Sequence, residues 1–395
     1  MNTSEIQHFS LNRILLLSIG LWPYKQSKLV LFQQILFFGL LTSFTVYQII
    51  LYFITEITDD FIVILSFILV YIVFIIEYNS FLINDQVVKN LLEQFIHVYD
   101  ELKDENEIDV MKKYISKAKR YIDGVTIVTV VALFTSMLIT TWTSILDIVK
   151  PNNESRSDLF ITYLTAHFAN PDKYRYLMLL YLNTTIYIGG IAISGTASML
   201  MGYLVYACGM FRIASYRIER AMTINNLYKN FEHETEIYKG IINAVNIHRK
   251  TMKICNYFMS SFNGTWSVLI VVGVLSLSLN IYQVFHCVAF GSSKQEFIIH
   301  FVLVAETLLY MFLTNYFGQE IINHNNHIFI TVYNGDWYIA PLHVQKLILF
   351  LLQVGNKTFG LRVNGLFTAS LHAFASVRNI LVTIKYTRCP IEIHD

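Results

Sequence analysis

The sequence predicts an all-α integral membrane protein with seven transmembrane helices, an N-terminus in the cytosol and a C-terminus outside the cell. Two observations lead to this prediction. Seven apolar stretches run through the chain, and the basic residues between them are distributed unevenly. Composition agrees, because 54% of the residues are apolar and only 14% are charged, whereas a soluble chain needs more charge to cover its surface.

Each apolar stretch is long enough to cross roughly 30 Å of hydrocarbon as a helix. All five prolines fall outside these stretches, so the helices are expected to be largely unkinked. The predicted spans are residues 29–54, 61–83, 121–149, 178–211, 260–285, 296–319 and 358–386.

The basic residues give the orientation. Segments before the first span and after spans two, four and six hold twenty Lys and Arg residues, and the opposite segments hold seven. Because cytosolic segments carry the excess of positive charge, the N-terminus is placed in the cytosol. This orientation is the reverse of a rhodopsin-type G-protein-coupled receptor. The chain also lacks an Asp-Arg-Tyr after span three and an Asn-Pro-x-x-Tyr in span seven, so that class is excluded.

The cytosolic segments carry apolar residues at helical spacing, which indicates folded helices below the membrane. Residues 84–120 and 212–257 are expected to extend the neighbouring spans, and residues 320–356 contain a short apolar helix, 342–354, that cannot span. We expect these segments to pack as a cytosolic anchor bundle with apolar faces that bury against neighbouring subunits. In residues 84–120 the apolar positions are Val88, Leu91, Leu92, Phe95, Val98 and Tyr99.

Six segments follow one another along the chain: LNRILLLSIGLWPYKQSK, IIEYNSFLIN, LLEQFIHVYDELKDENEI, ACGMFRIASYRIERAM, VYNGDWYIAPLHVQKLILFLLQ and GLFTASLHAFAS. In this order and spacing they resemble the insect odorant receptor family, and ant receptors most closely. The resemblance extends over nearly the whole chain.

The resemblance implies an odorant-binding tuning subunit of a tetrameric, ligand-gated, non-selective cation channel, formed with the olfactory co-receptor and requiring no G protein. The expected location is the plasma membrane of olfactory sensory neuron dendrites. The chain then divides into a cytosolic N-terminal segment (1–28), transmembrane helices one to six (29–319), the anchor segment (320–356) and a pore-lining helix with an atypical tail (357–395). Two alternatives stay open: a seven-helix chemoreceptor of the gustatory type, or a non-conducting membrane binding protein.

The resemblance also implies a ligand pocket in the outer half of the membrane among spans two, three, four and six. Such a pocket is expected to be apolar and aromatic and to hold a small apolar odorant or cuticular compound, with membrane lipid around the chain. Each candidate residue has ordinary helix packing as its alternative role. The candidates are Phe67 and Tyr71; Thr135, Leu138 and Trp142; Tyr181, Thr185 and Ile188; and Phe297, His300, Phe301 and Val304.

Other polar residues give weaker signals. Glu306 lies within span six, and an ionisable side chain at membrane depth needs a reason; it faces either the pocket or a neighbouring polar group. Glu77 is expected at the cytosolic boundary. His324 and His327 have metal-like spacing but no carboxylate or cysteine partner in sequence, so no metal or other cofactor is expected. Asn153 begins a glycosylation sequon in a long outer loop.

No sequence motif supports an enzyme, since the chain lacks a phosphate loop, HExxH, CxxC and a nucleophile elbow. The formal net charge is +1, which argues against nucleic acid as a partner.

The C-terminal tail departs from the family pattern. Phe367, Leu371 and Phe374 match it, but Thr383-Ile384-Lys385 stands where Ser-Tyr-Phe is expected. The gate would then fall at Thr383, Thr387, Pro390 and Ile391. Two explanations are open: a genuine variant with basic residues at the outer mouth, or read-through of an intron after about Ser376.

Overall fold

The computed structural model describes eight stretches of the chain: residues 10–24, 27–54, 60–149, 171–227, 231–291, 294–355, 359–365 and 367–376. Its α-helices are α2 (Ser10–Ser18), α3 (Lys28–Ile54), α4 (Asp60–Ile83), α5 (Asp85–Asp100), α6 (Glu105–Val149), α8 (Pro171–Leu227), α9 (Phe231–Phe290), α10 (Lys294–Asn334) and α11 (Leu342–Gly355). A 3-10 helix, η2 (Trp337–Ile339), precedes α11, and two short strands, β1 (Arg362–Val363) and β2 (Phe367–Thr368), follow it.

Six helices within the described residues are long and apolar enough to cross a membrane: α3, α4, α6, α8, α9 and α10. They contain the first six predicted spans. The last four have 45, 57, 60 and 41 residues, which at about 1.5 Å per residue is roughly twice to three times the hydrocarbon thickness. Each of these four helices is therefore much longer than one crossing of the hydrocarbon requires. Residues 85–100, by contrast, form a separate helix, α5.

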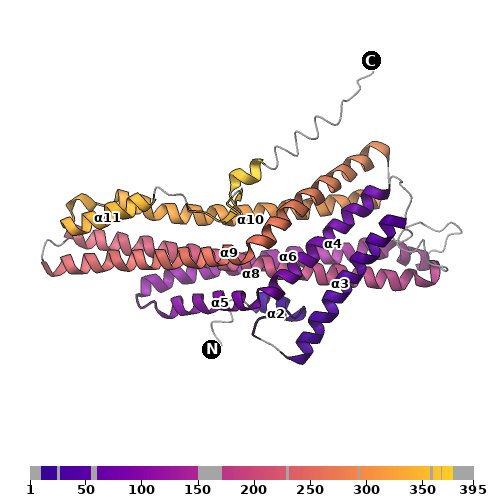
Figure 1. Ribbon diagram of the computed structural model, residues 1–395, viewed down its shortest axis with the longest axis horizontal. Coiled ribbons are helices and arrows are strands. Elements are labelled where there is room, and N and C mark those ends of the chain that lie inside the picture. Colours follow the sequence, from indigo (N-terminus) through magenta and orange to yellow (C-terminus); the bar gives the residue numbers. More distant parts are fainter. Residues whose placement is uncertain are drawn as a thin grey trace, which may run out of the picture.

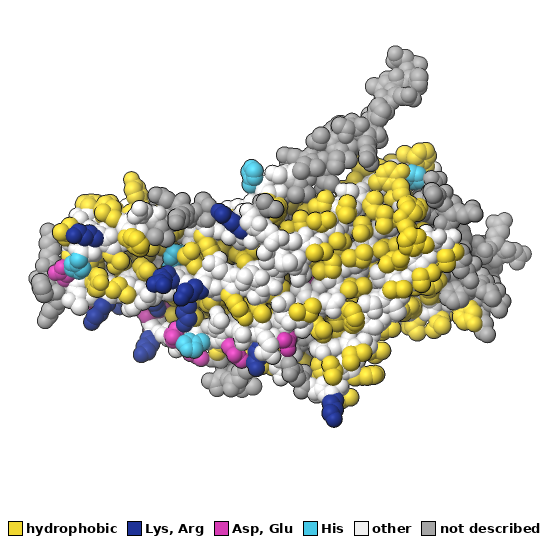
Figure 2. Space-filling view, in the orientation of Figure 1, with side chains coloured by type: hydrophobic (Ala, Val, Ile, Leu, Met, Phe, Trp, Pro, Cys, Tyr) yellow, Lys and Arg dark blue, Asp and Glu magenta, His cyan; other side chains and the backbone are white. Residues whose placement is uncertain are grey.

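The two ends of the elongated molecule differ in surface chemistry. The end that carries α11 and the junction of α8 with α9 lies at the left of Figure 1, and the ends of α3 and α4 lie at the right. On the face shown in Figure 2, charged side chains gather over the left part, whereas hydrophobic side chains cover most of the right part. An apolar belt beside a charged bundle is the pattern expected of a protein half embedded in lipid.

Helix α8 is the centre of the fold. It packs against α2, α3, α4, α6, α9 and α10, and most of its residues between Ala192 and Met222 are buried. Many of them are small, including Ala192, Ser194 and Ser198, which are at most 4% exposed. Small residues let membrane helices approach closely, so the composition of α8 accounts for its central position.

Ion pairs and an apolar face hold the charged bundle together. Arg217 in α8 binds Glu107 in α6 through two parallel bonds of 2.7 and 2.8 Å, a geometry that only Arg provides. Lys250 in α9 donates to Glu101 at 2.7 Å, and this bond lowers the pKa of the Glu101 carboxyl. The apolar face predicted for residues 84–120 is buried in α5, at Val88, Leu91, Leu92, Phe95 and Val98.

The predicted seventh span begins too early. Strands β1 and β2 pair antiparallel as a hairpin, and helical residues begin only at Leu371. Asn364 and Gly365 have positive φ values of 49° and 70°, which a helix does not allow and a tight hairpin loop requires. The Asn364-Gly365 pair is a sequence signal for such a hairpin. Residues 377–386 of that span lie outside the described residues.

The hairpin is fixed between α9 and α10. The backbone N–H of Asn364 donates to Asn263 Oδ1 of α9 at 2.7 Å, and Asn364 Nδ2 donates to Ser267 Oγ at 2.6 Å. On the other side, the backbone N–H of Ser370 donates to Asn315 Oδ1 of α10 at 3.0 Å. The start of the C-terminal segment is therefore positioned by two membrane-spanning helices.

Candidate functional site

The larger of two neighbouring cavities, which we call the α6 cavity, lies between α4, α6, α8 and α10 and has a volume of about 480 Å³. This size falls within the range of small-molecule sites. One continuous stripe of α6 lines it, formed by Arg120, Tyr121, Gly124, Val125, Val128, Thr129, Ala132, Leu133, Ser136, Ile139 and Thr140. These residues extend over about 30 Å of helix, so the cavity is long and narrow.

Most polar groups in the wall of the α6 cavity already have partners inside the protein. The Tyr71 hydroxyl lies 3.1 Å from Thr185 Oγ1, Thr129 donates to Ser194 at 2.8 Å, and Thr140 donates to Asn183 at 2.9 Å. Groups that are bonded internally have less capacity for a ligand. The cavity is therefore suited to a largely apolar molecule.

Two of the residues predicted from sequence to bind ligand, Phe67 and Tyr71 of α4, lie in the wall of the α6 cavity. Thr185 of α8 lies behind Tyr71 and is fully buried, so it orients the tyrosine hydroxyl from outside the cavity. The structure thus brings one predicted pair into the wall and places a third residue in support of it.

The residues predicted on α6 lie beside the cavity-lining stripe. Leu138 is 43% exposed, and Thr135 hydrogen-bonds back to the carbonyl of Val131. Trp142 belongs to α6, but its side chain lies outside what the structure describes. Each residue turns an α-helix by about 100°, and it is the adjacent face of α6 that carries Ser136 and Ile139 into the cavity.

The other predicted residues on α8 pack in helix interfaces. Tyr181 contacts Ser43 of α3 at 2.5 Å and meets the edge of Phe44, with ring centroids 5.0 Å apart. Ile188 is 5% exposed within the main core. Instead of these residues, α8 contributes Leu182, Ile186, Gly190 and others to the α6 cavity.

The predicted residues on α10 lie near the cavity without lining it. His300 is 1% exposed, and its Nδ1 lies 2.9 Å from Asn280 Oδ1 of α9. Phe301 is 55% exposed and stacks on Phe297, and Val304 is half-buried. The lining positions on this helix are Ile299, Val302, Leu303, Glu306, Leu309, Tyr310 and Leu313.

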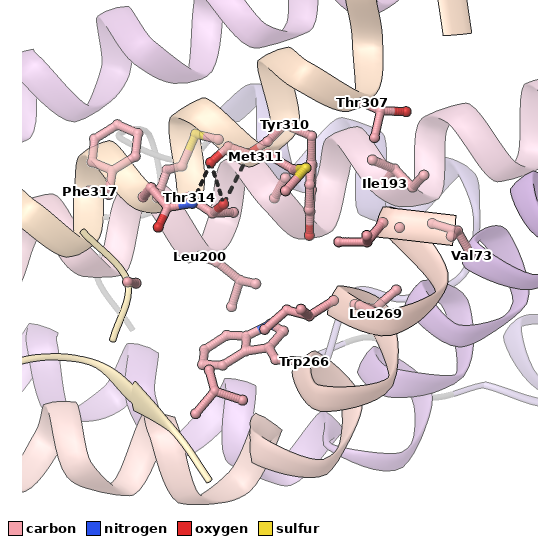
Figure 3. A pocket seen from close by; sticks show the side chains of 18 of the residues that line it. Val73, Ile193, Leu200, Trp266, Leu269, Thr307, Tyr310, Met311, Thr314 and Phe317 are labelled. Carbon is pink, nitrogen blue, oxygen red and sulfur yellow. Dashed lines mark hydrogen bonds between the residues drawn. The ribbon is translucent and has the colours of Figure 1, made fainter. Parts of the chain in front are cut away.

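A second cavity, which we call the α9 cavity, has a volume of about 290 Å³ and lies between α4, α8, α9, α10 and the hairpin. Figure 3 shows Trp266 and Leu200 on one side of it and Tyr310, Met311 and Thr314 on the other. Leu361, Val363, Phe367 and Ala369 complete the wall. This cavity therefore touches the segment that leads into the C-terminal helix.

The two cavities share a wall. Tyr310 lines both and donates to Glu77 Oε1 at 2.7 Å, while Thr196 of α8 donates to Glu77 Oε2 at 3.2 Å. Glu77 is 3% exposed. Its carboxyl is enclosed between α8 and α10. The residues common to both walls are Val70, Phe74, Ile193, Ala197, Met201, Leu303, Glu306 and Tyr310.

The remaining candidates are the histidine pair, the glycosylation sequon and the gate residues. His324 Nε2 lies 2.8 Å from the Tyr114 hydroxyl, and His327 lies 3.3 Å from Ser215 Oγ. Across the stretches that the structure describes, no group of three or more potential metal ligands is found. Asn153 and the gate candidates Thr383, Thr387, Pro390 and Ile391 lie outside the described residues.

Comparison with known proteins decides the family. The protein-family model described as 7tm Odorant receptor matches residues 81–382, which is most of the chain. The chain belongs to the odorant receptor family. A search of curated protein sequences finds no match for it.

Solved structures of an odorant receptor share the fold. The insect olfactory receptor OR5 from Machilis hrabei is 15% identical, with a TM-score of 0.75 and coverage of 98% of both chains. The same receptor in complex with eugenol is 14% identical, with a TM-score of 0.76 and coverage of 96% of this chain and 97% of that one. The fold of this odorant receptor is therefore that of the insect olfactory receptor structures.

Proposed function

We propose that this odorant receptor is the odorant-binding tuning subunit of a ligand-gated, non-selective cation channel, which it forms with the olfactory co-receptor in the plasma membrane. The observation that carries the proposal is the α6 cavity, a long apolar space among four helices of an odorant receptor. The complex of a structural neighbour with eugenol supports a small organic ligand. No G protein takes part.

The ligand lies in the α6 cavity, with Phe67 and Tyr71 in contact with it. These rings provide flat apolar area, and the 3.1 Å contact with Thr185 holds the Tyr71 ring in its position. The ligand stabilises the open state by binding it more tightly than the closed state, which shifts the equilibrium between them.

Helix α10 transmits the change to the C-terminal segment. The same helix lines the α6 cavity through Glu306 and Tyr310 and holds residue 370 through Asn315. Phe312 of α10 also meets Phe374, with ring centroids 5.7 Å apart. A displacement of α10 therefore moves the start of the C-terminal helix, which lines the pore.

The chain is oriented with its N-terminus and charged bundle in the cytosol. This orientation puts the excess of basic residues on the cytosolic side. Assembly with the co-receptor uses the bundle, where α11 leaves large apolar side chains uncovered: Leu342 is 67% exposed and Phe350 is 64% exposed. Exposed apolar area of this kind is typical of subunit interfaces.

The test is a patch recording from cells that express this chain with and without an insect olfactory co-receptor, using a broad odour panel and a block of G-protein signalling in the pipette. A fast cation current that needs both subunits and survives the block is the expected result. A response that disappears with the block would reject the channel mechanism. Surface labelling of the chain distinguishes a silent receptor from one that fails to reach the membrane.

A further inference from the structure

We infer that the Glu306 carboxyl is the specificity-determining group of the α6 cavity and that it selects small amphiphiles whose polar end donates a hydrogen bond, such as alcohols and primary amines. The inference rests on the proposed function and deepens it by naming a ligand class. It starts from the position of Glu306 on α10, where the residue lines both the α6 and the α9 cavities.

Among the described residues, no hydrogen bond or ion pair joins Glu306 to another residue, and Glu306 is exposed to the space around α10. The Glu77 carboxyl, by contrast, is buried and accepts hydrogen bonds from Tyr310 and Thr196. A carboxyl within a membrane-spanning helix normally pairs with another group. The unmet hydrogen-bonding capacity of Glu306 is therefore available to a ligand.

The nearest cation in the same wall is too far away to pair with it. Arg120 lies on α6 next to Tyr121, whose hydroxyl is 3.4 Å from that of Tyr316 on α10. Tyr316 is ten residues beyond Glu306 on the same helix, which corresponds to about 15 Å along its axis. Arg120 thus marks the far end of the α6 cavity, while Glu306 lies within its length.

The neighbouring polar groups already have hydrogen-bond partners in the protein, so they compete little with Glu306 for the polar end of a ligand. Thr307 donates to the carbonyl of Leu303 at 2.8 Å, Ser136 donates to that of Leu133 at 2.8 Å, and Tyr310 donates to Glu77. A ligand hydroxyl or ammonium group that enters this apolar space finds its strongest acceptor at Glu306. An ether or alkane of similar length enters the same space but has no hydrogen to donate to the carboxylate, and a site that loses such a partner discriminates strongly.

The experiment measures binding directly, on the purified full-length chain in lipid nanodiscs, from the rise in thermal unfolding temperature with ligand concentration. The probes are octanol, octylamine, octyl methyl ether and octane, and the variants are Glu306→Leu and Glu306→Gln. The control is Thr307→Val, which removes a neighbouring hydroxyl that is already bonded within its own helix.

The wild type is expected to bind octanol and octylamine about tenfold more tightly than octyl methyl ether. Glu306→Leu removes this preference. Glu306→Gln keeps the preference for octanol, because an amide oxygen still accepts a hydrogen bond, and loses the preference for octylamine. Thr307→Val changes the affinities for all four probes by a similar factor.

A wild type that binds the alcohol no better than the ether, or that binds neither, overturns the inference, as does a Glu306→Leu variant with an unchanged preference. Because the readout needs neither a current nor the co-receptor, it separates this inference from the channel proposal. Selective binding without a current in the patch recording would reject the channel and keep the ligand class.

Discussion

The α6 and α9 cavities are neighbours with similar apolar walls, yet they differ in what they touch. The α6 cavity is lined by four helices, α4, α6, α8 and α10. The α9 cavity replaces α6 with α9 and the hairpin, so part of its wall is the segment that leads into the C-terminal helix. Their common wall contains Tyr310 and Glu306. We therefore expect the α6 cavity to bind the ligand and the α9 cavity to leave room for the hairpin to move.

Substitutions in the common wall, or where the hairpin packs against α9 and α10, are therefore expected to change activity and stability most. Four substitutions test this expectation, and each affects one cavity or one contact. The chain supplies its own control, Gly39 in α3, which lines neither cavity and has nothing within 4 Å of an added Cβ.

The largest effect is expected from Gly318→Ala, where α10 packs against Ala369 at the end of the hairpin. An added Cβ would lie 2.4 Å from the carbonyl oxygen of Ala369, so the hairpin backbone has to move, at a cost of up to about 3 kcal/mol. The current is expected to be lost while ligand binding to the purified chain persists. Gly264→Ala on α9, where an added Cβ meets nothing, is the matched control. Equal currents from both variants would contradict a role for the hairpin in gating.

Tyr310→Phe tests the common wall. The substitution removes the 2.7 Å bond to Glu77 and leaves a buried carboxyl with one donor fewer, which is expected to cost about 2 kcal/mol of stability. The measurement is the thermal unfolding temperature of the purified chain. Tyr187→Phe serves as the control, since that hydroxyl contacts only the sulfur of Met137 among the described residues, at 3.3 Å. A similar shift in the unfolding temperature of both variants would show that the bond between Tyr310 and Glu77 adds no particular stability.

Gly124→Leu reduces the length of the α6 cavity at the end near Arg120. An added Cβ at Gly124 meets nothing within 4 Å, so the new side chain enters the empty space without straining the fold. Dose–response curves for a homologous series of alcohols are expected to shift about tenfold for long chains, which lose about two buried methylenes, and little for short ones. A shift independent of chain length would place the ligand elsewhere.

Gly273→Leu is expected to have the smallest effect on affinity. Gly273 lines only the α9 cavity, and an added Cβ there is also unobstructed. Ligand binding should change by less than about threefold, with the maximal current reduced because the hairpin has less room. Gly39→Leu should leave both quantities at the wild-type level. A large loss of affinity in Gly273→Leu would assign the ligand to the α9 cavity.

The sequence determined the helices of this odorant receptor and their order. The apolar stretches 29–54 and 61–83 correspond to α3 and α4, because a helix that crosses hydrocarbon must be apolar along its whole length. The short helix at 342–354 and the buried face of α5 were equally readable from their period. These features depend only on residues that are close together along the chain, so a single sequence is enough to predict them.

The site was less predictable than the helices. Phe67 and Tyr71 lie in the wall of the α6 cavity, whereas the residues expected on α6 and α10 lie beside the lining positions. The sequence does not separate these positions, because lipid-facing, protein-facing and cavity-facing sides of a membrane helix are all apolar. Only packing distinguishes them: Leu138 and Phe301 turn outward, while Ser136 and Leu303 turn into the cavity.

What the sequence by itself determined was the membrane fold, the family and the presence of an ionisable residue, Glu306, at membrane depth. Only the tertiary structure decided that Glu77 is paired and Glu306 is not, since hydrogen bonds between helices join residues more than a hundred positions apart. It also decided that strands β1 and β2 pair as a hairpin. Their apolar side chains suit a helix as well as a cavity wall, and the contacts of Asn364 with α9 and Ser370 with α10 favour the second.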